Sequence, residues 1–454
     1  MNKKYLIPFI ALGISVLAAT SAFAEGWTKE NNIWTYQDSS GNKVTSSWKR
    51  GADGEWRYLD ANGYMATNAW VDDNEYYVDS SGKIEKGTWK QATDPISGGS
   101  TMYWFYLLSD GKVAKSTWRK INDKYYYFDE DGHMLTGWVF EDTYYLGDDG
   151  AMKTGWAQLE DPDGNSSSDF APGDEVQDGE NWYYFSSSGR KYCAENDGEY
   201  IEKRISGKKY CFDSDGVLQF GWVNMNGEDE VGEKITDYKY YNSDGTLRTG
   251  WYSLVPPADL DGHYEDDVEW FYFNSDGTPR ANDKNYYTTS DFTKIGGKTY
   301  MFNEWGTPVY GIKKVYLSNS LSSYTAYYFG TKSQSNLQKG TQKIDEYGTT
   351  VTYFFTESSG VGYTGVKSTR LYYMGRLQKA DSDTKYEIVS LPSGSDTYSN
   401  YLVNSSGKVM KKSKVKDADG LQYITDASGI VTSIDGVAVS NTNSYRTPEE
   451  PTFE

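Results

Sequence analysis

The side chains that could carry out catalysis are few in this chain. It has two histidines, His133 and His263, and two cysteines, Cys193 and Cys211, and none of these lies in residues 311–454. That region therefore has no histidine-based triad, cysteine nucleophile or histidine-ligated zinc site. The cysteines lie one hairpin apart and are compatible with a disulfide or with a reduced pair. We expect both histidines to be surface residues.

Acidic side chains could also do chemistry, because two carboxylates a few ångströms apart are enough for glycoside hydrolysis. Most Asp and Glu residues here lie in turn and loop segments, where solvation accounts for them. Asp259, Asp261, Asp266 and Asp267 form a cluster that suggests calcium, but their spacing matches no EF-hand loop. The sequence therefore predicts no enzyme, no metal site and no cofactor.

Aromatic side chains are the remaining candidates. The chain has 42 Tyr and 15 Trp, and aliphatic residues are sparse, so aromatic rings must supply most of the buried area. Between Trp27 and Trp251 one pattern recurs: Trp, a polar stretch, two or three aromatics, an Asp/Ser-rich turn ending in Gly, and the next Trp. A chain of such copies predicts a stack of small units with ligand sites at the contacts between units.

Each copy has the features of one β-hairpin. Segments such as Trp34–Tyr36, Trp56–Tyr58 and Tyr125–Tyr127 alternate with period two, and an Asp/Asn/Ser cluster closed by Gly follows as a tight turn. The turn glycines are Gly41, Gly63, Gly82, Gly111, Gly132, Gly150, Gly189, Gly216, Gly245, Gly277 and Gly306. A lone hairpin is marginal, whereas stacked hairpins share their aromatic faces. We expect an all-β, elongated solenoid of hairpins built from ~20-residue repeats.

The chain divides into four parts by sequence pattern. Residues 1–24 have a basic start, an apolar run and a small-x-small cleavage site, typical of a secretory signal peptide. Residues 25–310 hold the repeat array, beginning directly after that site, and residues 311–439 are either degenerate repeats or a small β-domain, since no Trp follows Trp305. Residues 440–454 are predicted to be a flexible tail.

Insertions interrupt the repeats between the closing Trp and the following aromatics, and their Asp, Glu, Gly, Ser and Pro content predicts surface loops. They cover residues 91–101, 158–180, 224–236 and 253–268.

The net charge of the chain is −20, and it becomes −22 without Lys3 and Lys4 of the signal segment. This charge argues against nucleic acid and against wrapping an anionic polymer by charge alone. The apolar run of the signal segment is too short and too alanine-rich to favour a membrane span. We expect a secreted protein without a membrane span.

The repeated motif resembles the cell-wall-binding, or choline-binding, repeat family, which includes glucan-binding repeats of streptococcal glucosyltransferases and carbohydrate-binding repeats of clostridial toxins. The motif is Thr-Gly-Trp, a spacer, an aromatic triplet, Asn/Asp-Ser-Asp-Gly and again Thr-Gly-Trp, and the resemblance covers Gly26 to Tyr310. The resemblance implies a β-solenoid with an open aromatic box between successive hairpins. Such a box attracts a quaternary ammonium through the ring faces.

Position by position, the first aromatic of the triplet is replaced at Glu75, Thr143 and Lys209. We therefore expect the contacts between units that include these residues, which we call joints, to be structural only. Strand alternation places the first and third triplet positions on one side. The resemblance implies these ligand-binding residues: Trp27, Trp34, Tyr36, Trp48, Trp56, Tyr58, Trp89, Trp104, Tyr106, Trp118, Tyr125, Tyr127, Trp138, Trp156, Trp182, Tyr184, Trp251, Trp270 and Tyr272.

The function implied by the resemblance is that of a non-catalytic protein associated with the cell surface. Its partner would be cell-wall teichoic acid of the choline type or a surface polysaccharide, bound through many aromatic sites. Two alternatives are an α-glucan or host-glycan binding protein, and an adhesive or structural stalk whose C-terminal region meets a partner protein.

Overall fold

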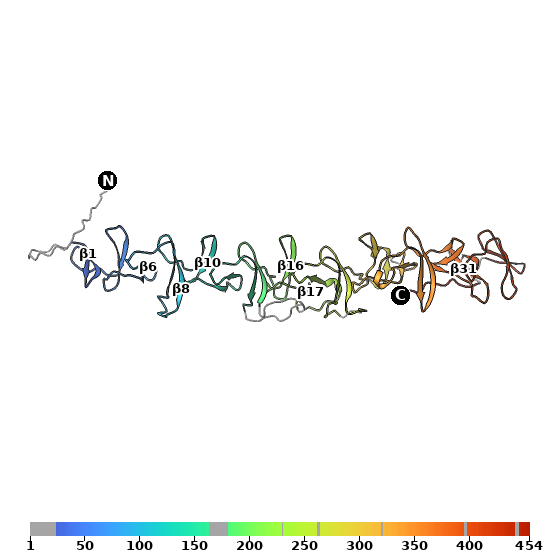
Figure 1. The fold of residues 1–454 in the computed structure, drawn as a ribbon, viewed down its shortest axis with the longest axis horizontal. Coiled ribbons are helices and arrows are strands. Elements are labelled where there is room, and N and C mark those ends of the chain that lie inside the picture. The colour runs from blue at the N-terminus through green and yellow to red at the C-terminus, as the bar shows by residue number, and fades with distance from the viewer. Residues whose placement is uncertain are drawn as a thin grey trace, which may run out of the picture. The chain divides into compact units, whose positions relative to one another are not determined.

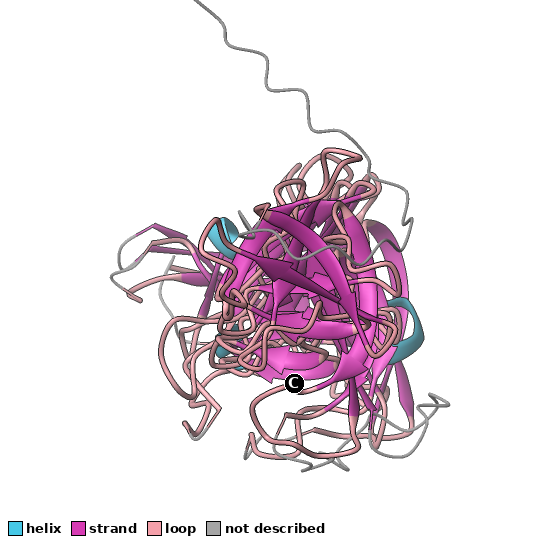
Figure 2. Cartoon of the chain, turned by 90° about the vertical axis from the view of Figure 1, so that its left-hand side faces the viewer, coloured by secondary structure: helices cyan, strands magenta, loops and turns pink. Residues whose placement is uncertain are grey.

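The computed structural model describes residues 24–162, 180–228, 230–260, 264–318, 321–394, 397–440 and 445–454. The expected signal peptide lies, apart from Ala24, outside these residues. The predicted all-β fold is confirmed, because helical structure in the described ranges is limited to the 3-10 segments Ile235–Asp237, Thr289–Asp291 and Lys332–Gln334 (Figure 2). No described helix is long and apolar enough to cross a membrane.

Two compact units make up the chain, the first holding most residues up to Cys193 and the second most residues from Ala194 onward. In the first unit, antiparallel hairpins follow one another in chain order (Figure 1). They are β1 (Gly26–Glu30) with β2 (Ile33–Gln37), β3 (Ser47–Arg50) with β4 (Trp56–Leu59), β5 (Ala69–Val71) with β6 (Tyr76–Val78), β7 (Thr88–Thr93) with β8 (Met102–Leu107), β9 (Thr117–Ile121) with β10 (Lys124–Phe128), β11 (Gly137–Val139) with β12 (Tyr144–Leu146), and β13 (Gly155–Glu160) with β14 (Glu180–Phe185).

The second unit begins with the same kind of hairpin and then includes wider sheets. Its two-stranded hairpins are β15 (Ile201–Ile205) with β16 (Lys208–Phe212), β17 (Gly221–Asn224) with β18 (Tyr238–Tyr241), β19 (Gly250–Leu254) with β20 (Glu269–Phe273), β22 (Thr293–Ile295) with β23 (Lys298–Tyr300), and β31 (Tyr386–Gly394) with β32 (Thr397–Asn404). The wider sheets join β21 (Tyr287–Thr288), β24 (Ile312–Tyr316) and β25 (Tyr324–Tyr328); β26 (Gly340–Glu346), β27 (Thr349–Phe355), β30 (Arg376–Leu377), β29 (Arg370–Tyr373) and β28 (Gly365–Lys367); and β33 (Lys414–Lys416), β34 (Gln422–Thr425), β35 (Val431–Ile434) and β36 (Val437–Ala438).

Where an aspartate opens the turn, its hydrogen bonds explain why the turn forms. The Asp60 carboxylate accepts hydrogen bonds from the amides of Asn62 and Tyr64 at 2.9 and 2.8 Å, and the Asp60 carbonyl accepts one from Gly63 at 2.9 Å. Gly63 has φ +76°, a left-handed conformation that favours glycine. The predicted Asp/Ser-rich turns are therefore Asx turns closed by glycine.

A second hydrogen bond ties each hairpin to the next. The amide of Met134, two residues after the turn glycine Gly132, donates to the carbonyl of Trp104 in the preceding hairpin at 2.7 Å. Met65 and Met152 bond in the same way to Trp34 and Tyr125, both at 2.8 Å. We call the residue two positions after a turn glycine the tail residue.

Alternation along the second strand of each hairpin determines burial. In β8, Trp104 is exposed, Phe105 is buried, Tyr106 is half-buried and Leu107 is buried. The strand β20 repeats this order from Trp270 to Phe273. The period-two pattern read from the sequence is therefore confirmed, and the buried positions form small cores between hairpins.

One expectation for a single residue, the surface position of His133, is wrong. The side chain of His133 is 12% exposed rather than on the surface, because its ring stacks on Tyr103 at 3.9 Å and lies between Asp94 and Asp129. His263 lies outside the described residues. Both cysteines are free, and burial raises the pKa of the Cys211 thiol to about 12.

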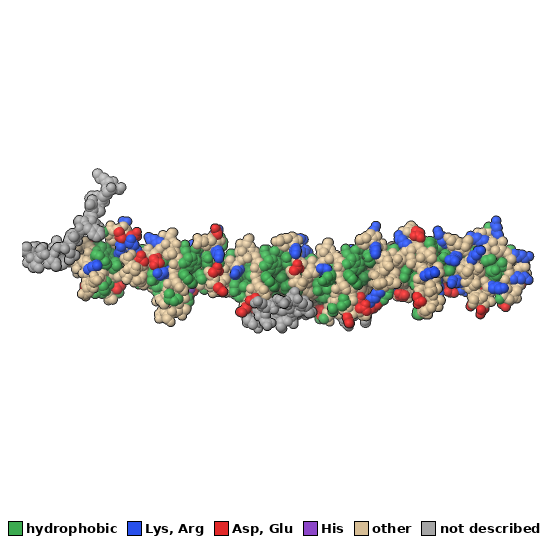
Figure 3. All heavy atoms as spheres, in the orientation of Figure 1, with side chains coloured by type: hydrophobic (Ala, Val, Ile, Leu, Met, Phe, Trp, Pro, Cys, Tyr) green, Lys and Arg blue, Asp and Glu red, His purple; other side chains and the backbone are tan. Residues whose placement is uncertain are grey.

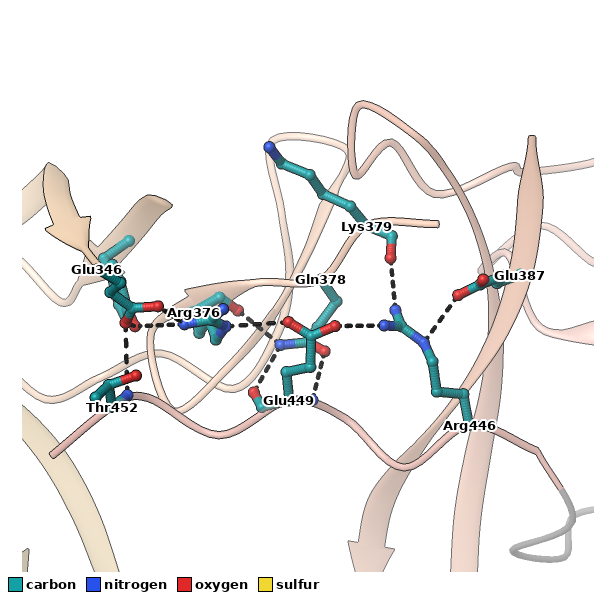
Figure 4. A network of polar contacts seen from close by, with 9 residues as sticks. Glu346, Arg376, Gln378, Lys379, Glu387, Arg446, Glu449 and Thr452 are labelled. Carbon is teal, nitrogen blue, oxygen red and sulfur yellow. Dashed lines mark hydrogen bonds and ion pairs between the residues drawn. The ribbon is translucent and has the colours of Figure 1, made fainter. Parts of the chain in front are cut away.

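The C-terminal residues predicted to form a flexible tail pack instead along the second unit. The Gln378 side chain, which is fully buried, exchanges two hydrogen bonds with the backbone of Glu449. Arg446 pairs with Glu387 and Glu449, and the carboxylate of Glu449 also pairs with Arg376 (Figure 4). Polar contacts hold this short segment together with packing of Phe453 against the core cluster of Ile312 and Phe355. We call residues 445–454 the strap.

Candidate functional site

Each repeat hairpin places its closing tryptophan directly opposite the third triplet ring. In the hairpin β7–β8, Trp89 is the register partner of Tyr106, and their ring centroids are 5.2 Å apart at 70°. The pairs Trp48–Tyr58 and Trp251–Tyr272 have the same edge-to-face geometry at 5.1 and 5.3 Å. Such aromatic pairs are favourable beyond their area, so the closing indole has a defined orientation.

Indole N–H groups orient the closing tryptophans further. Trp138 donates to the carbonyl of Glu160 at 3.0 Å, and Trp48 donates to the Asp72 carboxylate at 2.8 Å. Both acceptors belong to residues that follow the hairpin of the donor. The ring is thus fixed at the joint, by which we mean the space between one hairpin and the next.

First triplet rings lie on the same face and project into solvent. Trp104 is 44% exposed and lies 6.3 Å from Trp89, ring centroid to ring centroid. Trp56 is 47% and Trp270 54% exposed. A large ring left this open on an otherwise packed face is available for a ligand.

The other wall of the joint comes from the next hairpin. Trp89 lies 4.9 Å from Tyr126, the middle triplet ring of β10, at an angle of 72°. The sequence analysis did not include these middle rings, because alternation alone does not show which face meets the previous hairpin. The tail residue Met134 packs in the same cluster, and its position after the turn glycine is the signal that could have identified it.

Four joints of the described part combine a closing Trp, an exposed or half-buried first ring and a middle ring from the next hairpin. They consist of Trp48, Trp56 and Tyr76; Trp89, Trp104 and Tyr126; Trp118, Tyr125 and Tyr144; and Trp251, Trp270 and Tyr300. Three ring faces around one space suit a cation that cannot donate hydrogen bonds. We call these the open joints.

The open joint at Trp251 borders a cavity in the second unit. Trp270 and Tyr300 line a cavity of about 610 Å³ together with Asn303, Thr307, Gln334 and Asn336. Glu265, Asp266 and Glu269 also lie at this site and hold Lys332 at 3.0, 2.8 and 3.5 Å. Aromatic rings thus face amide, hydroxyl and charged groups across one cavity.

At the first joint the ring set is incomplete. Arg57 occupies the middle triplet position of β4, and the ammonium groups of Lys29 and Lys49 lie 4.9 Å over Trp34 and 4.8 Å over Tyr36. A cavity of about 900 Å³ nevertheless lies nearby, lined by Trp34, Tyr58, Tyr64, Met65 and Trp70.

Lysines of the chain itself also lie at other joints. At the joint of β11–β12 with β13–β14, the tail residue Lys191 places its ammonium 5.0 Å over Trp138 and 5.8 Å over Tyr183. Glu75, in the first triplet position of its hairpin, pairs with Lys112 and Lys115 at 3.5 Å each. Charged side chains of the chain occupy space that aromatic rings leave open elsewhere.

At the joint of β15–β16 with β17–β18, charged residues occupy the closing, first and middle ring positions. Glu202 stands where the other hairpins have the closing Trp, and it binds Lys209 at 3.4 Å and Lys239 at 2.8 Å. Burial acts against the charge of Glu202, but Lys239, the Tyr241 hydroxyl at 3.0 Å and Lys209 keep its pKa below the usual range. This joint binds internal cations through a carboxylate.

An insertion closes the joint after β17–β18. Tyr238, in the first triplet position, is only 1% exposed because it packs with Leu254 and Leu260 of the segment 253–268 and donates to Asp259 at 2.6 Å. This segment was expected to be only a surface loop. Its apolar residues contribute to the core, so that expectation is wrong in part. Asp261 of the acidic cluster lies outside the described residues.

The remaining predicted residues lie as follows. Trp156 is the partner of Tyr184 at 5.0 Å and lies 6.4 Å from Trp182, and Trp27 is the partner of Tyr36 at 5.4 Å. Trp118 lies 5.3 Å from Tyr127 and, like it, contacts Phe140, which the sequence analysis did not select.

Stacked β-hairpins with aromatic rings at their joints define a repeat protein built for binding. Family models match as a choline-binding repeat at residues 42–84, a choline-binding repeat at residues 114–156, and a cell wall binding repeat at residues 176–191 and 265–278. The chain therefore contains choline-binding, or cell wall binding, repeats at these residues.

Solved structures of pneumococcal proteins are similar to this chain. The autolysin LytC from Streptococcus pneumoniae with a synthetic peptidoglycan ligand is 22% identical, with a TM-score of 0.38, over 64% of this chain and 54% of that chain. The choline-binding domain of CbpL from Streptococcus pneumoniae is 25% identical, with a TM-score of 0.32, over 50% and 98%. CbpJ from Streptococcus pneumoniae TIGR4 is 17% identical, with a TM-score of 0.31, over 85% and 100%. The chain thus spans about half the length of the autolysin, and a search of curated proteins gave no match.

Proposed function

We propose that this chain is a secreted, non-catalytic protein that attaches to choline-bearing teichoic acid at the bacterial cell surface through its open joints. The observation that carries this proposal is the joint of Trp89, Trp104 and Tyr126, where three rings face one space and the first ring is 44% exposed. Each ring contributes about 0.5–2 kcal/mol to holding a quaternary ammonium. Several such joints on one chain favour a polymer that presents choline repeatedly.

Two groups that could have supported catalysis, Cys211 and His133, are largely buried. The Cys211 thiol is buried and has a pKa raised to about 12, so it is not a ready nucleophile. His133 is packed against Tyr103. These placements support a binding role.

Retention on choline-substituted resin, with elution by free choline, tests the proposal. The wild-type chain should be retained and released by millimolar choline. The Trp56→Ala/Trp104→Ala variant should elute at lower choline while keeping its circular-dichroism spectrum. Tyr347→Ala is the matched control, because Tyr347 is a 93% exposed aromatic residue outside the joints. Passage of the wild-type chain through choline resin, but retention on dextran, would refute the choline proposal.

A glycan is the second candidate ligand, and one observation favours it. The cavity at Trp270 sets exposed rings against the amides of Asn303 and Gln334, and pyranoses bind between such rings and planar polar groups. If a neutral oligosaccharide quenches the fluorescence of the wild-type chain but not of the Trp270→Ala variant, this joint binds sugars. An unchanged response in both chains would exclude it.

A further inference from the structure

The charge of the chain is distributed unevenly. Of the 45 Lys and Arg and 65 Asp and Glu residues, residues 311–454 hold 16 basic and 14 acidic ones. The strongly acidic balance therefore belongs to residues 1–310. Within residues 397–416 there are five lysines and no acidic residue.

These lysines are exposed, as is Arg370, the bridge partner of Lys408. We call Arg370, Lys408, Lys411, Lys412, Lys414 and Lys416 the basic strip. All six are exposed, and none forms an ion pair with another described residue. Figure 3 shows blue side chains gathered over this part of the second unit. In the array, by contrast, Lys90 and Lys124 pair with Glu85 and Asp149 at 2.9 and 2.8 Å.

Backbone pairing forces some of these cations together. Arg370 and Lys408 are direct partners in an antiparallel bridge, and Arg370 is also the register partner of Lys367 in the pair β28–β29. Like charges directly opposite each other destabilise a sheet. An anion bound across them would remove that repulsion.

The hairpin β33–β34 places part of the strip on the face that carries the closing tryptophans in the array. The amide of Lys412 donates to the carbonyl of Asp426 at 2.7 Å, and this is the hydrogen bond that Ser116 makes with Asp129 two residues before Trp118. Lys414 therefore stands in the position of a closing tryptophan. Lys416 follows two residues later on the same side of the strand.

Several acids of the second unit already have partners within it. Asp426 caps its own turn, accepting from the amides of Ser428 and Ile430 at 2.8 and 2.9 Å. Asp417 accepts from the Tyr423 hydroxyl at 2.8 Å, and Glu387 pairs with Arg446 at 3.0 Å. The charge of the strip is left to solvent or to a partner.

The geometry points to the basic strip as a second binding surface, one for the phosphodiester backbone of the teichoic acid polymer. This inference rests on the proposed function, since a choline-bearing teichoic acid carries both quaternary ammonium groups and backbone phosphates. Open joints take the ammonium groups through ring faces. The strip takes the phosphates, because exposed lysines bind phosphate oxygens as point charges.

The test uses a teichoic acid without choline, poly(glycerol phosphate), and the full secreted chain. The wild-type chain should bind it with an affinity that falls steeply as salt rises. The variant Lys411→Gln/Lys412→Gln/Lys414→Gln/Lys416→Gln should bind roughly tenfold or more weakly, with a flatter salt dependence. A matched control, Lys86→Gln/Lys120→Gln/Lys124→Gln/Lys153→Gln, makes the same change in net charge at exposed array positions and should bind as the wild type does.

Choline resin separates this inference from the proposed function. The strip variant should be retained and eluted like the wild type, since no joint is altered. Equal binding of poly(glycerol phosphate) by wild type and strip variant would overturn the inference, as would equal weakening by the array control. Equal affinity of the wild type for poly(glutamic acid) would also overturn it, because the strip would then not distinguish phosphodiesters from carboxylates. If the wild-type chain failed on choline resin yet bound poly(glycerol phosphate) through the strip, the proposed function alone would fail.

Discussion

At the scale of single residues, one ring type has two roles that depend on its place in the strand. Phe105 is fully buried and Trp104, its neighbour, is 44% exposed. The first stabilises the hairpin stack by removing apolar area from water, and the second contributes a face to the joint. Substitutions at the two positions should therefore separate folding from binding.

The exposed ring gives the clearest prediction. Trp104→Ala should remove one wall of the joint with Trp89 and Tyr126, lowering choline affinity there by about 0.5–2 kcal/mol. Stability should change by less than about 1 kcal/mol, because the ring is largely solvated. Calorimetric titration with choline gives the affinity, and urea unfolding gives the stability.

Phe105→Ala is the counterpart of that variant. It should cost roughly 3–5 kcal/mol of unfolding free energy, because it leaves a cavity. If Trp104→Ala unfolds as readily as Phe105→Ala, the first ring is part of the core and the assignment is wrong.

Sequence could predict the hairpin and the face of each ring, because alternation and turn chemistry are local. It could not supply Tyr126 or Tyr300 as the opposite wall, since that depends on how one hairpin stacks on another. Nor could it show that Lys191 lies over Trp138, because a long flexible side chain carries no periodic signal. The ligand-binding roles of the selected rings remain predictions.

At the scale of the hairpin, a joint is open or closed according to two positions, the first ring and the tail residue. Thr143 and Lys191 replace the ring and the apolar tail residue at the joint that contains Trp138. The backbone is unchanged there, since the amide of Lys191 still donates to the carbonyl of Thr143 at 2.9 Å. The difference between open and closed joints is therefore one of side chains.

Restoring those side chains should create a binding site. The variant Thr143→Trp/Lys191→Met should bind one more choline per chain than the wild type, with an affinity similar to that of the Trp104 joint, because it rebuilds the Trp, Tyr and Met surround. Calorimetric stoichiometry measures this directly. The single variant Lys191→Met is the control and should add little, as one wall is still missing. No change in stoichiometry for the double variant would show that rings alone do not define a site.

The joint at Glu202 leads to a different prediction, which concerns the stability of the hairpin β15–β16. Glu202→Gln should lower the unfolding free energy by roughly 1–3 kcal/mol, because Lys209 and Lys239 then face each other without their shared counter-ion. Adding Lys239→Met should recover part of that loss, and a double-mutant cycle in urea unfolding measures the coupling. Additive effects of the two substitutions would mean that the ion pair contributes nothing. Choline stoichiometry should stay unchanged throughout.

At the scale of the whole molecule, different parts of the chain use charge in different ways. Open joints and acidic residues dominate the array, whereas lysines on the last hairpins are left unpaired. The second unit also holds the strap in place, with Arg376 between Glu346 and Glu449 (Figure 4). The region 311–454 thus ends in a segment that returns to contact β24, since the amide of Glu454 donates to Ile312 at 3.1 Å.

The strap should make the stability of the second unit depend on pH. Burial acts to raise the pKa of Glu346, but hydrogen bonds from Tyr353 and Arg376 outweigh it and hold the pKa below 4.5. A carboxyl whose folded pKa is depressed contributes stability above its unfolded pKa, and that contribution is lost as the pH falls through the folded value. Hydrogen exchange of the strap amides should therefore accelerate as the pH falls below about 4.5, after correction for intrinsic rates.

Glu346→Gln should show faster exchange already at neutral pH, with roughly 1–3 kcal/mol less protection, and a weaker response to acid. Glu357→Gln, a change at an exposed carboxylate of the same unit, should behave like the wild type at every pH. An unchanged acid response in Glu346→Gln would show that the pH dependence arises at another group than Glu346.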